Sequence, residues 1–190
     1  MDFKNTVLQN HPFCAVKKKI PVIAPAILLL LLVFCKERQP NTDVRVTMES
    51  TIKANFESFI KNGWNNGDIK KVKTIADENY IRTLNGITVA THHNEMEANM
   101  NIFIEGFPDC EITIEQIILK DNNLFAQWIF KGTNNGVFGE SAPTGKKVNI
   151  NGCSTLLFNE QGKIAKEDVY YNELELLQQL GYSLIPPILE

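Results

Sequence analysis

The chain has 190 residues, of which 44% are hydrophobic, 22% charged and 9% aromatic, and this composition excludes long disordered, collagen-like and low-complexity architectures. Nineteen Lys and Arg against 22 Asp and Glu give a net charge of −3. Without a basic excess or a basic cluster beyond the first 20 residues, nothing points to nucleic acid as a partner.

Residues 1–35 are predicted to form a leader rather than part of a domain. Lys17, Lys18 and Lys19 precede an apolar run of 15 residues, Ile20–Phe34, which is shorter than the about 20 residues of a membrane-spanning helix and typical of a secretory signal. The run ends at Cys35, which resembles the lipidated cysteine of a bacterial lipoprotein. An uncleaved signal anchor is the alternative. In both cases we expect export to the cell envelope, with the leader as the only membrane tether.

The remaining 155 residues, 36–190, carry 15 Lys and Arg and 21 Asp and Glu, a net charge of −6, which does not favour anionic ligands or anionic lipid. We expect a tether over 36–46, one domain over 47–184 and a tail over 185–190. The spacing of Cys110 and Cys153 demands no disulfide, so two free thiols are expected. No metal-binding spacing and no dinucleotide or phosphate-binding motif occurs, so no metal or other cofactor is expected.

Hydrophobic periodicity predicts helices first and long strands second. Helices are expected over 47–63 and Ile69–Ala76, and a third carries the buried stripe Met96, Met100, Phe103 and Phe107 before Pro108 stops it. After a short extended segment at Tyr80–Leu84, strands and a final helix are expected over Cys110–Lys120, Leu124–Thr133, Lys147–Phe158, Lys163–Tyr171 and Glu173–Leu180. This order indicates an α+β fold, with three N-terminal helices against a curved antiparallel sheet of four to six strands.

Several short motifs follow one another between residues 68 and 181. They are Phe107–Asp109, Gly132–Gly139, Pro143–Val148, Gly162–Ile164 and Asn172–Gly181. Together they resemble the SnoaL-like polyketide cyclase family, which is also called the ester cyclase family. The resemblance implies a nuclear transport factor 2-like fold, a cone-shaped α+β barrel with a pocket in its open end.

The resemblance also implies a type of chemistry. The characterised reaction of the family is an intramolecular aldol ring closure, in which an acid/base residue removes a proton beside a carbonyl group and polar groups hold the enolate. The family's acid/base aspartate falls on Asn172, and an amide neither takes nor gives a proton at neutral pH. The family tryptophan falls on Asp168 and a motif histidine on Asn134, while Glu167 is retained beside Lys166.

Asp168, Tyr170 and Asn172 alternate on one face of the last strand. If that face lines the pocket, Asp168 is a carboxylate with a raised pKa and can act as the catalytic base. In the alternative, Asp168 lies at a wet rim or pairs with Lys166 or Lys131. Asn172 is a candidate for binding a ligand carbonyl group, or it only caps the helix that follows.

Two neighbouring histidines, His92 and His93, open the helix that carries Met96. A helix N-terminus disfavours the charged imidazole, so one of them, with His93 as the candidate, could serve as a neutral base. The alternative is a solvated histidine in the first turn.

Aromatic side chains are candidates for the wall of an apolar pocket. Trp128 and Phe130 share one face of the second long strand, and the alternative inner set on that strand is Phe125, Gln127 and Ile129. The candidate ligand-binding residues are therefore Trp128, Phe130, Tyr170, Trp64 and Asn134.

Two functions are compatible with these patterns. One is a cyclase- or isomerase-type enzyme that acts on a small apolar carbonyl compound, with Asp168 or a histidine as the base. The other is a tethered, non-catalytic module that binds a hydrophobic metabolite. The expected partners are a small apolar ligand and, through the outer face of the sheet, a second copy of the chain.

Overall fold

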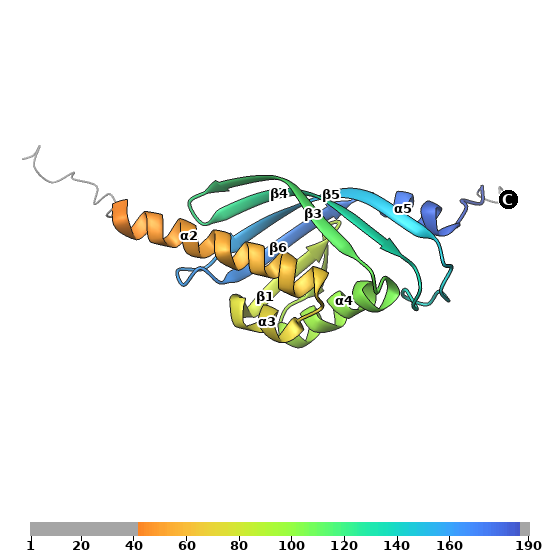
Figure 1. Cartoon of the computed structure of the whole chain (residues 1–190), viewed down its shortest axis with the longest axis horizontal. Helices are drawn as coiled ribbons and strands as arrows, with labels where there is room; N and C mark the ends of the chain where they lie inside the picture. Colours follow the sequence, from red (N-terminus) through yellow and green to blue (C-terminus); the bar gives the residue numbers. More distant parts are fainter. Residues whose placement is uncertain (1–41, 187–190) are drawn as a thin grey trace, which may run out of the picture. The chain divides into compact units, whose positions relative to one another are not determined.

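Three helices precede the last four strands, as predicted, but two further strands, Ala76–Leu84 and Ile87–Ala90, lie between the second and the third of these helices. The computed structural model describes residues 42–186, so the predicted leader, with Cys35, lies outside the described residues. The elements in chain order are α2 (Thr42–Ser58), η1 (Phe59–Asn65), α3 (Ile69–Ile75), β1 (Ala76–Leu84), β2 (Ile87–Ala90), α4 (His93–Gly106), β3 (Glu111–Lys120), β4 (Asn123–Thr133), β5 (Lys147–Phe158), β6 (Ile164–Tyr171) and α5 (Glu173–Leu180) (Figure 1).

The first helix begins earlier than expected and ends in an unusual turn. α2 starts at Thr42, so the last residues of the predicted tether are helical. From Phe59 onward the helix widens into the π-helical segment η1, a rare form that often lies at functional sites. Gly63 allows η1 to pack closely on α3, because a Cβ at this position would approach the Val72 side chain to less than 3.0 Å.

All six strands form one sheet in the order β2-β1-β6-β5-β4-β3. The predicted α+β cone is confirmed, but the expectation of a purely antiparallel sheet is wrong at one pair, since β1 and β6 run parallel. These two strands are separated in sequence by α4 and four strands, so no hairpin dictates their relative direction.

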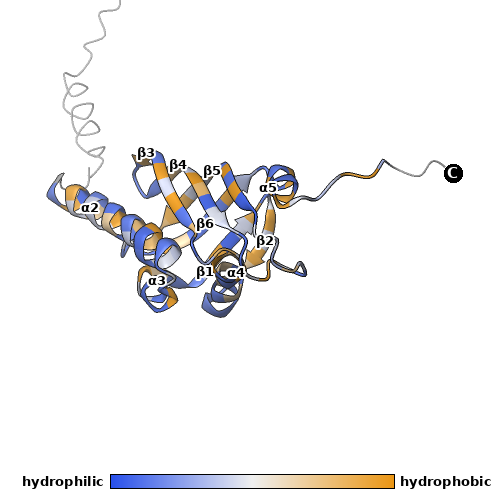
Figure 2. Ribbon diagram, turned by 45° about the vertical axis from the view of Figure 1, so that its right-hand side comes forward, coloured by the Kyte–Doolittle hydropathy of each residue, from blue (hydrophilic) through white to orange (hydrophobic). Residues whose placement is uncertain are grey.

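The core lies between the concave face of the sheet and the helices α2, α3 and α4, which cover one side of it (Figure 1). Hydropathy alternates along the sheet strands in Figure 2, and burial follows the same period of two on β4, where Leu124, Ala126, Trp128 and Phe130 are buried. The helix α4 contributes its predicted stripe of Met96, Met100 and Phe103. A strand side and a helix stripe thus meet in one apolar interior.

Several local predictions are also tested by the structure. Asn172 caps α5, since its side chain accepts a hydrogen bond from the Glu175 backbone N–H at 3.1 Å, and Gly181 ends the helix with φ of 101°. Cys110 and Cys153 are free thiols, as predicted. Within residues 42–186, no helix has both the length and the apolar composition that crossing a membrane requires.

Candidate functional site

The concave face of the sheet encloses a small cavity against η1 and α4. We call it the central cavity. It offers about 40 Å³ to the centres of water-sized molecules, within about 540 Å³ of empty space that includes its mouth. Its lining comprises Phe56, Ile60, Trp64, Arg82, Leu84, Phe103, Ile112, Trp128, Phe130, Ile150, Ser154, Glu167, Val169 and Tyr171. Most of these side chains are apolar, so the few polar groups among them determine the chemistry.

A buried ion pair lies in this lining. Arg82 on β1 and Glu167 on β6 are register partners across the parallel strand pair, and each is 3% exposed. Arg82 Nη1 donates a hydrogen bond to Glu167 Oε2. Tyr80 Oη donates to the same oxygen at 2.6 Å. The guanidinium group also lies 4.9 Å from the ring centroid of Trp64, so the charge of Arg82 has both an anionic and an aromatic partner.

Two polar atoms of the ion pair remain without a protein partner. Both hydrogen bonds to Glu167 end on Oε2, and across residues 42–186 none ends on Oε1. Arg82 Nε is buried and has no acceptor among the described residues. A buried donor without a partner costs about 1–3 kcal/mol. The ion pair that lines the central cavity therefore keeps one donor, Arg82 Nε, and one acceptor, Glu167 Oε1, that no other described residue uses.

The environment keeps the neighbouring phenols protonated. Burial, reinforced by the Glu167 carboxylate, raises the pKa of Tyr80 well above its usual range. Burial also raises the pKa of Tyr171 to about 12. Desolvation by itself would lower the pKa of Arg82, but the negative charge of Glu167 outweighs it and the pKa is raised. At neutral pH, Tyr80, Tyr171 and Arg82 are all proton-bearing donors.

A second polar pair lies on the floor of the central cavity. Trp128 on β4 donates its Nε1–H to Ser154 Oγ on β5 at 3.0 Å. Ser154 is buried, with 5% of its surface exposed. Because the hydroxyl oxygen accepts from Trp128, its own proton stays available for a ligand acceptor.

Asp168 does not take the position expected for a catalytic base. On β6, Glu167, Val169 and Tyr171 line the central cavity, whereas Asp168 and Tyr170 lie on the opposite face, because neighbouring strand residues alternate sides.

The pairing of Asp168 is the predicted alternative. Its carboxylate accepts hydrogen bonds from Thr83 Oγ1 at 2.7 Å and from Lys166 Nζ at 2.8 Å. Partial burial would raise the pKa of Asp168, but the bonds from Lys166 and Thr83 outweigh it and the pKa is lowered. The predicted upward shift is therefore wrong.

The amide candidates Asn134 and Asn172 do not line the central cavity either. Asn172 is exposed and caps α5. Asn134 is buried, but its side-chain Nδ2 donates to the Gly106 and Gly136 carbonyl groups, and its Oδ1 accepts from the backbone N–H and hydroxyl of Thr144. These four bonds tie the long loop after β4 to the end of α4 and leave Asn134 little capacity for a ligand.

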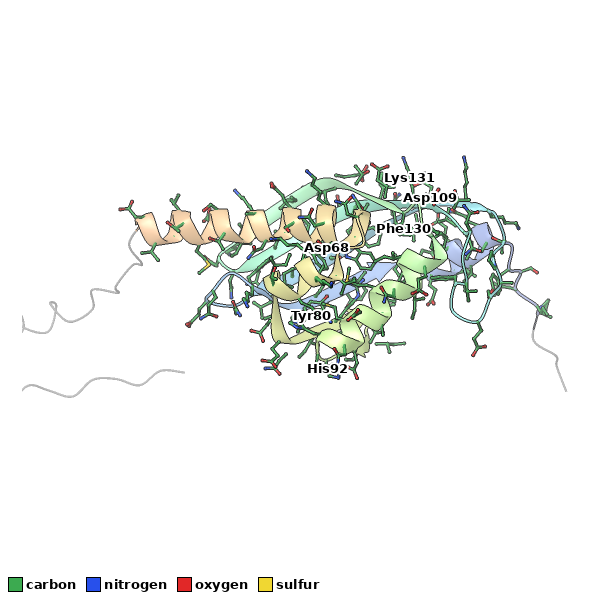
Figure 3. All side chains as sticks on the ribbon, turned by 60° about the horizontal axis from the view of Figure 1, so that its bottom comes forward. Asp68, Tyr80, His92, Asp109, Phe130 and Lys131 are labelled. Atoms are coloured by element: carbon green, nitrogen blue, oxygen red, sulfur yellow. The ribbon has the colours of Figure 1, made fainter. Side chains whose placement is uncertain are left out.

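The two histidines lie at the N-terminal end of α4. His92 is exposed, 3.5 Å from Glu95, and Figure 3 shows it at the outer margin of the molecule. His93 is partly buried, and its Nε2 has no hydrogen-bond partner among residues 42–186. Neither histidine is among the residues that line the central cavity.

Of the four aromatic residues predicted to form the pocket wall, three line the central cavity and one does not. Trp64, Trp128 and Phe130 line the central cavity, so β4 uses the inner set that includes Trp128 rather than the alternative set around Gln127. Tyr170 is 49% exposed on the opposite face of the sheet. Whether the three wall residues bind a ligand stays a prediction.

Sequence reasoning missed Arg82 as a site residue. Its signal was a charged residue between Tyr80 and Leu84, two positions from each and on the same side of the strand. A charge on the apolar side of a strand requires a buried partner. Glu167 is that partner.

Comparisons with known proteins agree with this architecture. A candidate SnoaL-like polyketide cyclase from Jannaschia sp. CCS1 superposes with a TM-score of 0.66 at 16% identity, over 78% of this chain and 99% of that one. A phenazine biosynthesis-related protein from Pseudomonas aeruginosa gives 0.63 at 14% identity, over 79% and 97%. An LEH-like epoxide hydrolase of M. tuberculosis gives 0.54 at 13% identity, over 69% and 90%. At such identities these likenesses show the fold alone.

The family itself is established by the sequence. No curated protein matches the chain. The model of the SnoaL-like polyketide cyclase family matches residues 54–180, a span from the second half of α2 to the end of α5 that contains every residue of the central cavity. The chain therefore belongs to the SnoaL-like polyketide cyclase family.

Proposed function

We propose that the chain binds a small, largely apolar carbonyl compound in the central cavity and transfers a proton on it by acid–base chemistry. The observation that carries this proposal is the buried pair of Arg82 and Glu167, with a free donor at Nε and a free acceptor at Oε1. The pair neutralises itself, so a neutral ligand suits the cavity better than an anion.

In the proposed reaction, Glu167 Oε1 takes a proton from the carbon beside the carbonyl group. The electron pair of the broken C–H bond forms a C=C bond, and the carbonyl oxygen becomes an enolate oxygen. Arg82 Nε–H and the Ser154 hydroxyl are the donors that would hold that oxygen. Return of the proton from Glu167 to another carbon completes an isomerisation. Alternatively, attack of the enolate carbon on a second carbonyl group closes a ring, and Glu167 returns its proton to the alkoxide oxygen that this attack forms.

Hydrogen–deuterium exchange tests this step without knowledge of the natural substrate. Acetone is the smallest ketone, and NMR in D₂O follows the exchange of its protons. We expect the wild-type protein to accelerate the exchange and the variant Glu167→Gln to lose about 100-fold or more of the acceleration. The matched control is Asp168→Asn, a carboxylate on the opposite face of the same strand, which should retain it.

A second set of variants separates lost chemistry from lost folding. Glu167→Gln leaves Arg82 as an uncompensated buried charge, which destabilises the fold. The double variant Arg82→Leu with Glu167→Leu removes both charges and should fold, as circular dichroism would report. If this double variant or Glu167→Gln exchanged acetone protons as fast as the wild type, Glu167 would not be the base.

A non-catalytic binding module is the second candidate function. The observation that favours it is that Asn172, which the motif resemblance matches to the family's acid/base aspartate, is exposed and serves as a helix cap. In that case acetone binds, as NMR titration would report, but its protons exchange at the buffer rate in the wild type and in Glu167→Gln alike.

The place and the partners of this activity are part of the proposal. The leader predicted over residues 1–35 would hold the domain at the cell envelope, and the outer face of the sheet would join two copies of the chain. Mass spectrometry of a peptide that contains Cys35 tests the predicted lipid anchor. Analytical ultracentrifugation of the domain tests the pairing of two copies.

A further inference from the structure

We propose that Trp128 sets the upper size of the ligand that the central cavity accepts. This inference rests on the proposed binding of a small molecule there. The space of about 40 Å³ is far below the about 150 Å³ of an apolar cavity that holds benzene. The positions of the wall residues therefore decide which molecules enter.

Trp128 lies where its neighbour lacks a side chain. Trp128 on β4 and Gly152 on β5 face each other in the register of the antiparallel pair. A Cβ added at Gly152 would come closer than 3.0 Å to three atoms of the Trp128 ring, a separation that real Cβ atoms do not show. Only glycine at residue 152 allows the indole ring to lie this close to the sheet.

The indole ring is also fixed at its polar edge. Its Nε1–H donates to Ser154 Oγ at 3.0 Å, and Ser154 follows Gly152 by two residues, on the same side of β5. The side chain of Trp128 is buried, with 7% of the residue exposed. Gly152 and Ser154 together hold the ring as a fixed part of the floor.

Trp128 packs against a glycine of the sheet, whereas other aromatic residues of the cavity wall pack against one another. Phe130 packs edge-to-face against Phe103 and Phe107 with centroid distances of 6.3 and 5.4 Å, and Phe103 packs in the same way against Trp64 at 6.1 Å. These rings are part of the packing between helix and sheet. The six-membered ring of Trp128 instead covers Gly152, so a smaller side chain at residue 128 should add its lost volume to the central cavity.

Ketones of increasing size provide the test. We measure the dissociation constants of acetone, cyclopentanone and cyclohexanone by NMR titration for the wild type, Trp128→Leu and the milder Trp128→Phe. In Trp128→Leu the ratio of cyclohexanone affinity to acetone affinity should rise about tenfold or more, with a smaller rise in Trp128→Phe. The control is Phe125→Leu, an aromatic on the same strand that does not line the central cavity, and its ratio should stay at the wild-type value.

A second variant tests the position of the ring without any ligand. Gly152→Ala should lower the melting temperature, because its Cβ collides with the indole ring. The double variant Gly152→Ala with Trp128→Leu should recover most of that loss, because the colliding atoms are gone. If the melting temperature of the double variant stayed as low as that of Gly152→Ala, the proposed packing of Trp128 against Gly152 would be wrong.

The outcomes separate the two proposals. Ketone binding in the wild type with an unchanged size ratio in both Trp128 variants overturns the size limit and leaves the proposed function standing. If no ketone binds to the wild type or to any variant, the proposed function fails and the size limit fails with it. A raised ratio in Trp128→Leu, with rescue of Gly152→Ala, supports the size limit and the proposed binding of a carbonyl compound, while proton exchange tests the proposed chemistry.

Discussion

Glu167 and Asp168 are adjacent carboxylates that live in opposite environments. Glu167 points into the central cavity with 4% of its side chain exposed, held by Arg82 and Tyr80. Asp168 points away from it with 23% of its side chain exposed, paired with Lys166, which is itself 43% exposed. The comparison teaches that a carboxylate is a candidate acid/base group because of the side of the strand on which it lies, and not because of its residue type alone. The side of the strand decides whether water or protein surrounds the carboxylate.

The largest test of this comparison is the removal of one cation from each pair. Arg82→Leu leaves Glu167 buried and unpaired, so we expect a loss of about 3–5 kcal/mol in the free energy of unfolding. Lys166→Met removes the partner of the half-buried Asp168 and should cost about 0–1 kcal/mol. Urea denaturation measures both values.

The double variant serves as the control for Arg82. Arg82→Leu with Glu167→Leu should be more stable than Arg82→Leu alone, because no uncompensated charge remains in the core. Equal losses for Arg82→Leu and Lys166→Met would show that the inner and outer pairs do not differ in the way we describe.

The hydrogen bonds from neutral hydroxyl groups provide a test of intermediate size. Tyr80→Phe removes the fully buried donor to Glu167 and should cost about 1.5–3 kcal/mol, as expected for a bond to a charged group. Thr83→Val removes the corresponding donor to Asp168, where water can replace it, and should cost less. Thermal unfolding of the two variants gives the ranking, and a larger loss for Thr83→Val would reverse the comparison.

The smallest expected effect is the contribution of Asp168, on the outer side of the sheet, to the pH dependence of stability. The pKa of Asp168 in the folded protein lies below its ordinary value of 3.8. Its stabilising contribution is therefore fully present above that value and is lost as the pH falls through the lower folded pKa. Asp168→Asn should reduce the steepness of the stability loss below about pH 4 and leave the stability profile near neutral pH nearly parallel to that of the wild type. Urea midpoints between pH 2 and 7 would check it, and an unchanged acid slope would contradict the assigned pairing.

Much of the fold was predictable because its signals are local. Lys147–Phe158 and Glu173–Leu180 were predicted with the bounds that the structure has, since turn residues and the cap Asn172 delimit them. The stripe of Met96, Met100 and Phe103 likewise identified the buried side of α4. The π-helical segment Phe59–Asn65 and the parallel pairing of β1 with β6 were not predictable, because both depend on packing between distant parts of the chain.

The candidate site was predicted only in part, for a reason visible on β6. Both sides of that strand carry a carboxylate and a tyrosine, so a pattern of period two cannot tell which side is inside. The same ambiguity on β4 left Phe125, Gln127 and Ile129 as an alternative inner set to Trp128 and Phe130. On β6, Asp168 was chosen over Glu167 because the family position of Asn172 suggested the wrong side.

The sequence by itself determined the family, the order of the three N-terminal helices and the last four strands, the cap of α5 at Asn172 and the apolar composition of the interior. Each of these follows from short-range periodicity or from motifs read along the chain. Only the tertiary structure decided that Glu167 rather than Asp168 enters the interior. That choice depends on Arg82, which lies 85 residues earlier in the chain and contacts Glu167 only because β1 and β6 pair. A buried charge is stable only on the side of the strand where it has a partner of opposite charge.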